Sequence, residues 1–213
     1  MVNSTQAGSK NEPSNGYDAF ATEFMRYRGE SSIGVATVRK WALGLQPGAT
    51  ILDLGCGHGV PLAAALIDDG FNVYGLDTSP TLTAAFRRRF PHAHVTCEAV
   101  EESAFFTRTF DGVLAIGLVF LLDPDEQRDL VQKVAQALNP GGRFLFTSPW
   151  QECTWTDVLT GRTSLSLGAD GYKAILAAAG LTLLDEYVDE GDNHYFDAHK
   201  YEPGEATAGA TAV

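Results

Sequence analysis

The sequence predicts an α/β fold, a three-layer sandwich in which helices cover both faces of a mostly parallel sheet. Short apolar runs alternate with amphipathic helical segments between residues 51 and 147, and this alternation is typical of a parallel sheet. With 213 residues and 45% hydrophobic content, the chain can bury one sizeable core. Two strand-like runs joined by a turn-rich stretch are the last elements expected, which predicts one antiparallel strand that closes the sheet.

The elements follow one another in a regular order. Aromatic residues at helical spacing, Phe20, Phe24 and Tyr27, predict a first helix from residue 17. Ser31 or Ser32 is placed to cap a second helix that runs to Leu45. Strands are then expected near Ile51–Leu54, Asn72–Leu76, His94–Cys97, Gly112–Ile116, Arg143–Thr147, Leu181–Val188 and His194–Tyr201. Helices are expected near Pro61–Asp69, Ser79–Arg89, Asp125–Leu138 and Ala169–Ala179. A single domain is expected over residues 17–201, because residues 1–16 and 202–213 have the polar, small-residue composition of disordered tails.

The stretch ILDLGCGHGVP, at residues 51–61, places an acid and alternate glycines directly after the first strand. Missing Cβ atoms let a ligand lie against the backbone, and the next helix turns its N–H groups toward that ligand. A tight turn that only packs helix on strand is the alternative, but it needs fewer glycines than Gly55, Gly57 and Gly59. The loop therefore predicts a ligand site.

Asp77 ends the second strand, where a carboxylate can accept both hydroxyls of a ribose or can cap the helix that begins at Ser79. Nicotinamide dinucleotides and S-adenosylmethionine both have such a ribose. The third glycine comes one residue earlier than in the dinucleotide motif G-x-G-x-x-G. Asp53 would repel a pyrophosphate but attract an ammonium group, which favours S-adenosylmethionine.

Four segments in this order resemble the class I S-adenosylmethionine-dependent methyltransferases: LDLGCGHG, VYGLDTSPTL, FDGVLAIGLVFLL and LNPGGRFLFTSP. The resemblance extends over about residues 17 to 200. It implies a Rossmann-like fold with a seven-stranded sheet in the order 3-2-1-4-5-7-6, in which strand 7 is antiparallel. It also implies methyl transfer from S-adenosylmethionine to a small organic acceptor with an O, N, S or C nucleophile, as in UbiE/UbiG-like enzymes.

By this resemblance, the residues expected to bind the cofactor are Tyr27, Arg28, Asp53, Gly55, Cys56, Gly57, Asp77, Thr78, Glu98, Ala99, Val100, Ile116 and Gly117. Arg28 would pair with the methionine carboxylate, or would be a solvated arginine at a helix end. The adenine contact stays open between the side chain of Glu98 and the backbone of Ala99 and Val100.

The stretch PWQECTWTDVLTGR after the fifth strand, together with the last hairpin, is expected to bind the acceptor. The residues are Trp150, Trp155, Asp157, Arg162 and Tyr195. A hydrophobic flap packed over the core is the alternative. His194 is the candidate general base, or else a hydrogen-bonded structural histidine. No Asn/Asp-Pro-Pro-aromatic motif follows the fourth strand, which disfavours methylation of nucleobase amines.

Charge and cysteine content limit the partners. Lys plus Arg is 15 and Asp plus Glu is 27, so the net charge of −12 disfavours nucleic acid and anionic membranes. Three unpaired cysteines without a metal-ligand pattern predict neither disulfides nor a metal. No apolar run approaches the ~18 residues of a membrane span. We therefore expect a soluble cytoplasmic monomer or homodimer. A nicotinamide-dependent oxidoreductase and a non-catalytic cofactor-binding module are the alternative functions.

Overall fold

The computed structural model describes residues 15–201 and is built on a seven-stranded sheet in the order β3-β2-β1-β4-β5-β9-β8. The strands are β1 (Thr50–Leu54), β2 (Asn72–Asp77), β3 (His94–Cys97), β4 (Phe110–Ala115), β5 (Leu138–Thr147), β8 (Thr182–Val188) and β9 (His194–His199). All pairs are parallel except those of β9, which is antiparallel to both β5 and β8. With β9 as the seventh strand and β8 as the sixth, the predicted strand order is confirmed.

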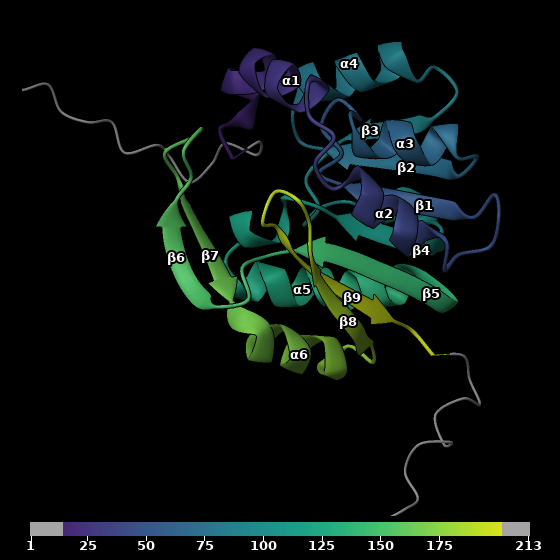
Figure 1. Cartoon of the computed structure of the whole chain (residues 1–213), viewed down its shortest axis with the longest axis vertical. Coiled ribbons are helices and arrows are strands. Elements are labelled where there is room, and N and C mark those ends of the chain that lie inside the picture. The colour runs from purple at the N-terminus through teal and green to yellow at the C-terminus, as the bar shows by residue number, and fades with distance from the viewer. Residues whose placement is uncertain (1–14, 202–213) are drawn as a thin grey trace, which may run out of the picture.

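Helices cover both faces of this sheet (Figure 1). On one face lie α2 (Val35–Ala42), α3 (Leu62–Asp68) and α4 (Pro80–Arg89), and on the other lie α5 (Pro124–Ala137) and α6 (Gly168–Ala178). Successive strand residues point to opposite faces, so Ile51 joins the core under α2 and α3 while Leu52 joins the core under α5 and α6. This burial on both faces explains why the strands are continuously apolar.

The two N-terminal α-helices begin at later residues than predicted. The chain first forms a 3₁₀ turn, η1 (Tyr17–Phe20), and then α1 (Ala21–Gly29). Helix α2 begins after Gly34, not at Ser31 or Ser32. Gly34 has a φ of 83°, and a Cβ there would lie 2.5 Å from the Tyr195 hydroxyl. Close packing against β9 therefore sets the start of α2, and the capping pattern alone did not reveal it.

The segment after β5 forms a second, two-stranded sheet that the sequence did not predict. Its strands are β6 (Glu152–Thr156) and β7 (Thr163–Leu167), and they pair only with each other. Asp157 organises the connecting turn, because its Oδ1 accepts hydrogen bonds from the Leu159 N–H, the Thr160 N–H and the Thr160 hydroxyl. The hairpin projects from the sheet toward η1 (Figure 1).

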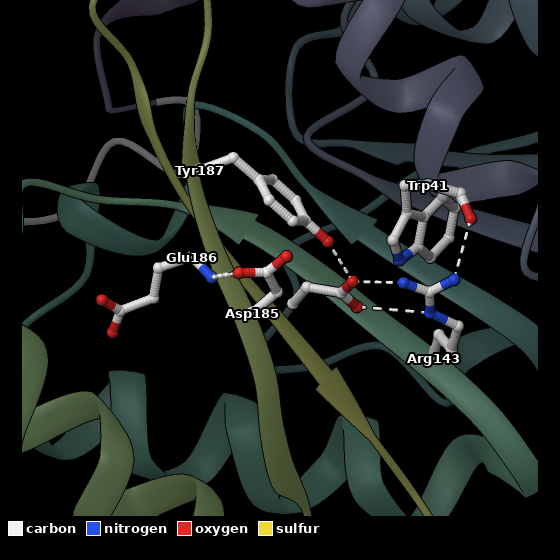
Figure 2. A network of polar contacts seen from close by, with 6 residues as sticks. Trp41, Arg143, Asp185, Glu186 and Tyr187 are labelled. Carbon is white, nitrogen blue, oxygen red and sulfur yellow. Dashed lines mark hydrogen bonds and ion pairs between the residues drawn. The ribbon is translucent and has the colours of Figure 1, made fainter.

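A polar network fastens α2 to the sheet (Figure 2). The Asp197 carboxylate pairs with the guanidinium of Arg143 and accepts a hydrogen bond from the Tyr187 hydroxyl. Arg143 also donates to the Trp41 carbonyl at 3.1 Å. The carboxylate is almost fully buried, with 1% of its side chain exposed against 17% for Arg143. Three strands and one helix therefore depend on one buried ion pair.

The predicted tails, residues 1–16 and 202–213, lie outside the described residues except for residues 15 and 16. Residues 15–201 contain no helix whose length and apolarity suffice to cross a bilayer.

Candidate functional site

A cavity of about 1120 Å³ opens at the carboxyl ends of β1, β2 and β4. Ligands of open α/β sheets bind at this edge. Most of the residues predicted for the site line it: Arg28, Asp53, Gly55, Cys56, Asp77, Thr78, Ala99, Val100, Ile116, Gly117, Trp155, Asp157, Arg162 and Tyr195. The cavity thus joins residues from the cofactor prediction with residues from the acceptor prediction.

Five predicted residues do not line the cavity: Tyr27, Gly57, Glu98, Trp150 and His194. Tyr27 and Trp150 are 64% and 59% exposed and lie on the surface. The Glu98 carboxylate accepts a hydrogen bond from the Ser103 hydroxyl at 2.9 Å, within its own loop. Of the residues considered for the adenine contact, Ala99 and Val100 line the cavity and Glu98 does not.

The glycine loop is held against the end of β2. Gly55 and Gly57 have φ values of 70° and 55°, in the left-handed region that favours glycine. The Gly57 N–H donates to Oδ2 of Asp77 at 2.8 Å. A Cβ on Gly57 would lie 3.0 Å from the Phe24 ring, so this glycine admits the close approach of α1.

Asp77 lies both beside the start of α4 and in the wall of the cavity. Its Oδ1 accepts the Ser79 N–H at 2.8 Å at the start of α4, and the same carboxylate lines the cavity. Ser79 itself is the N-cap. Burial raises the pKa of Asp77, and the two backbone hydrogen bonds oppose that rise. A carboxylate has about four lone-pair sites, so acceptor capacity remains for a ligand's hydroxyls.

Asp53 is the most unusual charge in the cavity. Its side chain is buried, and within residues 15–201 it accepts no hydrogen bond. Burial, followed by the nearby charge of Asp77, raises its pKa to about 7, while Arg28 acts in the opposite direction. Burial also lowers the pKa of Arg28. The site therefore holds a poorly compensated carboxyl group beside a partly buried guanidinium.

Aromatic side chains form part of the cavity wall. Tyr17, Phe24, Phe120 and Trp155 all line the cavity. The Phe120 and Trp155 ring centroids are 5.3 Å apart, and those of Tyr17 and Phe24 are 5.8 Å apart in an edge-to-face arrangement. Only Trp155 was predicted for the site. The signal for the others was weak, because helical spacing explains Phe24 equally well as a core residue.

Two contacts join the N-terminal segment to the hairpin tip across the cavity. The Tyr17 hydroxyl donates to Oδ2 of Asp157 at 3.0 Å, and Arg162 donates to the side-chain oxygen of Asn15 at 3.2 Å. Burial, and then the charge of Asp157, raises the pKa of Tyr17. We call these contacts the N-terminal bridge, and all four residues line the cavity.

His194 lies on the opposite face of β9 from the cavity-lining Tyr195. Its ring packs 4.8 Å from that of Phe196, and its Nε2 is 3.9 Å from a carboxylate oxygen of Glu186. Burial lowers the pKa of His194. Tyr195 instead donates its hydroxyl proton to Asp189 at 2.9 Å. The position of His194 thus gives no support to its predicted role as a general base.

Comparison with known proteins finds the family described as "Methyltransferase domain", which matches residues 51–142. An uncharacterised methyltransferase of Synechocystis is 28% identical over 113 residues, which are 53% of each chain. This chain spans about half the length of the curated relatives it matches.

Solved structures share the fold over most of the chain. The S-adenosylmethionine-bound amino pentose methyltransferase CalS10 of Micromonospora echinaspora has a TM-score of 0.66 at 19% identity, over 84% of this chain and 96% of its own. The 1,6-didemethyltoxoflavin-N1-methyltransferase of Burkholderia thailandensis, solved with its acceptor and S-adenosylhomocysteine, has a TM-score of 0.64 at 20% identity, over 94% of each chain. At sequence identities of 19% and 20%, these similarities establish a shared fold and nothing more.

Proposed function

We propose that the chain is a class I S-adenosylmethionine-dependent methyltransferase that transfers a methyl group to a small organic acceptor. S-adenosylmethionine, the cofactor of this family, supplies an electrophilic methyl group on a positively charged sulfonium. The work left to the protein is to hold the cofactor and the acceptor in line, since orientation supplies much of the rate in such displacements.

The residues of the cavity fit this cofactor. The observation that carries the proposal is the buried Asp53 carboxyl group, which lines the cavity without a hydrogen bond from residues 15–201. A buried carboxylate is stabilised by a cation or a hydrogen-bond donor, and the ammonium of a methionine moiety is both. Arg28 would pair with the methionine carboxylate. Asp77 would accept the ribose hydroxyls, with Gly55 and Gly117 leaving room along the cofactor.

The two alternative functions are less well supported. A dinucleotide pyrophosphate would have to lie beside Asp53, whose charge would repel it. The glycine spacing also departs from the dinucleotide motif. A non-catalytic module would keep the cofactor residues, but it would not need an aromatic wall beside them.

We further propose that the acceptor is a small molecule with a ring or other flat apolar group. Aromatic side chains line the cavity, and aromatic pairs gain about 0.5–1.5 kcal/mol beyond their buried area. Under this proposal Trp155 positions the acceptor and leaves the cofactor untouched.

Trp155→Ala tests the proposal, with Trp150→Ala as a matched control on the exposed start of the same segment. Purified protein is incubated with S-adenosylmethionine and a panel of ring-containing amines, phenols and heterocycles, and formation of S-adenosylhomocysteine is measured. With an acceptor in hand, loss of Trp155 should raise the acceptor KM about 10-fold or more. Cofactor affinity should stay within about twofold for both variants, and Trp150→Ala should change neither quantity.

Three results would contradict the proposal. Binding of NADH without binding of S-adenosylmethionine would establish the oxidoreductase. Normal cofactor binding without turnover on any acceptor would favour the non-catalytic module. Equal KM values for the Trp155 and Trp150 variants would place the acceptor elsewhere.

A further inference from the structure

We propose that Lys133 is a positioning residue for the adenine-binding end of the cavity. It lies on α5, on the opposite side of the sheet from the glycine loop's helix, and it does not line the cavity itself. Its role is to hold the loop after β3 in the shape that receives the base. The inference rests on the cofactor assignment and not on the identity of the acceptor.

The lysine is bonded directly to the loop that borders the cavity. Its Nζ donates to the Val100 carbonyl at 2.6 Å and to the Glu101 carbonyl at 3.1 Å. The ammonium also lies 4.9 Å from the centroid of the Phe105 ring, within reach of a cation–π contact. Ala99, Val100 and Glu101 all line the cavity. One side chain therefore fixes two consecutive peptide groups of the cavity wall.

Fixing the Val100 carbonyl also fixes the next N–H. A trans peptide is planar, with its C=O and N–H pointing in opposite directions. The Glu101 N–H therefore points away from Lys133. Among the described residues this N–H donates no hydrogen bond. By holding the loop, Lys133 directs the unused Glu101 N–H to the side of the loop away from α5. A ring nitrogen of a base can accept a hydrogen bond from this N–H.

The other restraints on the loop act at its two ends. The Glu98 N–H donates to the Asp77 carbonyl at 3.1 Å, and the Ser103 N–H donates to the Ala99 carbonyl at 2.9 Å. Neither reaches the carbonyls of Val100 and Glu101. Burial lowers the pKa of Lys133, and the acids Glu101 and Glu98 oppose that change.

A purely structural tie between α5 and the loop is the competing explanation, and the chain offers a matched control for it. Lys200 donates to the carbonyls of Ala135 and Leu138 at 2.7 Å each, at the end of the same helix. It forms the same kind of contact, but Ala135 and Leu138 do not line the cavity, whereas Val100 and Glu101 do. If Lys133 only stabilised the fold, Lys133→Met and Lys200→Met would behave alike.

The experiment measures ligand binding by calorimetry for wild type, Lys133→Met, Lys133→Gln and Lys200→Met. Three ligands are compared: S-adenosylhomocysteine, 5′-methylthioadenosine, which lacks the amino acid, and S-ribosylhomocysteine, which lacks the base. Lys133→Met should weaken both adenine-containing ligands by a common factor of about 10, because hydrogen bonds from a charged donor are lost. Affinity for S-ribosylhomocysteine should change less than about twofold.

Lys133→Gln keeps one amide donor and should lie between wild type and Lys133→Met, which guards against a methionine variant that folds poorly. Lys200→Met should lower the melting temperature without changing the ratio between ligands. The inference is overturned if Lys133→Met leaves all affinities unchanged, or if it weakens all three ligands equally. Should wild type not bind S-adenosylhomocysteine at all, the proposed function itself would fail, so the two failures are distinguishable.

Discussion

At the scale of single residues, the charge of Asp53 favours cofactor binding but lowers the stability of the folded protein. Its pKa of about 7 lies above the ordinary value of about 3.9 for an unfolded chain. Between those two values the folded protein keeps a proton that the unfolded chain has lost. Asp53 therefore lowers the free energy of unfolding progressively as pH rises through that window, and the full cost is present above pH 7.

Asp53→Asn should remove this cost. The free energy of unfolding should rise by about 1–3 kcal/mol at pH 8, and the gain should shrink at pH 5. Cofactor affinity should fall about 10-fold or more at pH 8, because the charge that meets the methionine ammonium is gone. Urea denaturation at both pH values and calorimetric titration with S-adenosylhomocysteine measure the two effects. A destabilised variant that binds normally would refute this role of Asp53.

The sequence predicted individual residues well where strand ends determine their position. Asp53 and Asp77 follow buried strands, so their place at one edge of the sheet was predictable before their contacts were known. For His194 and Tyr195, the sequence could not predict which of the two side chains faces the cavity. Side chains alternate along a strand, and a one-residue slip exchanges its two faces. The aromatic and charged pattern of β9 did not specify which of the two residues faces the cavity.

At the scale of elements, the β6–β7 hairpin and the N-terminal segment act as one unit. Tyr17 and Asp157 are 140 residues apart in the chain, yet their side chains are bonded. Neither short strand carried enough apolar alternation to be recognised, and no sequence pattern reports a contact of such separation. The site prediction therefore found Trp155 and Asp157 individually but missed the structure that joins them to Tyr17.

Tyr17→Phe should loosen this unit without unfolding the protein. The ring and its contact with Phe24 remain, while the hydrogen bond to Asp157 is lost. We expect faster amide hydrogen exchange over residues 157–163 and a higher acceptor KM, by about three- to tenfold. Affinity for S-adenosylhomocysteine should hardly change. Tyr27→Phe on α1 is the control, because Tyr27 is exposed and outside the cavity. Unchanged exchange in the Tyr17 variant would show that the N-terminal bridge does not restrain the hairpin.

At the scale of the whole molecule, the strand order was the most predictable property. Alternating strand and helix patterns leave few topologies open, and the resemblance selected one of them. What escaped prediction is the buried polar network between α2 and the sheet, since it joins residues of α2, β5, β8 and β9. Neither Arg143 nor Asp197 lines the cavity.

Because the network does not line the cavity, we expect substitutions in it to lower the free energy of unfolding without changing cofactor affinity. Asp197→Ala leaves the Arg143 guanidinium largely buried without its carboxylate, and breaking such a pair costs about 3–5 kcal/mol. Tyr187→Phe removes one hydrogen bond from the same carboxylate and should cost only about 1 kcal/mol. Urea denaturation measures both free energies of unfolding. Under conditions where each variant is still folded, calorimetry should give the wild-type affinity for S-adenosylhomocysteine. A loss of affinity in Asp197→Ala would mean that the network also shapes the cavity, through β9 and Tyr195.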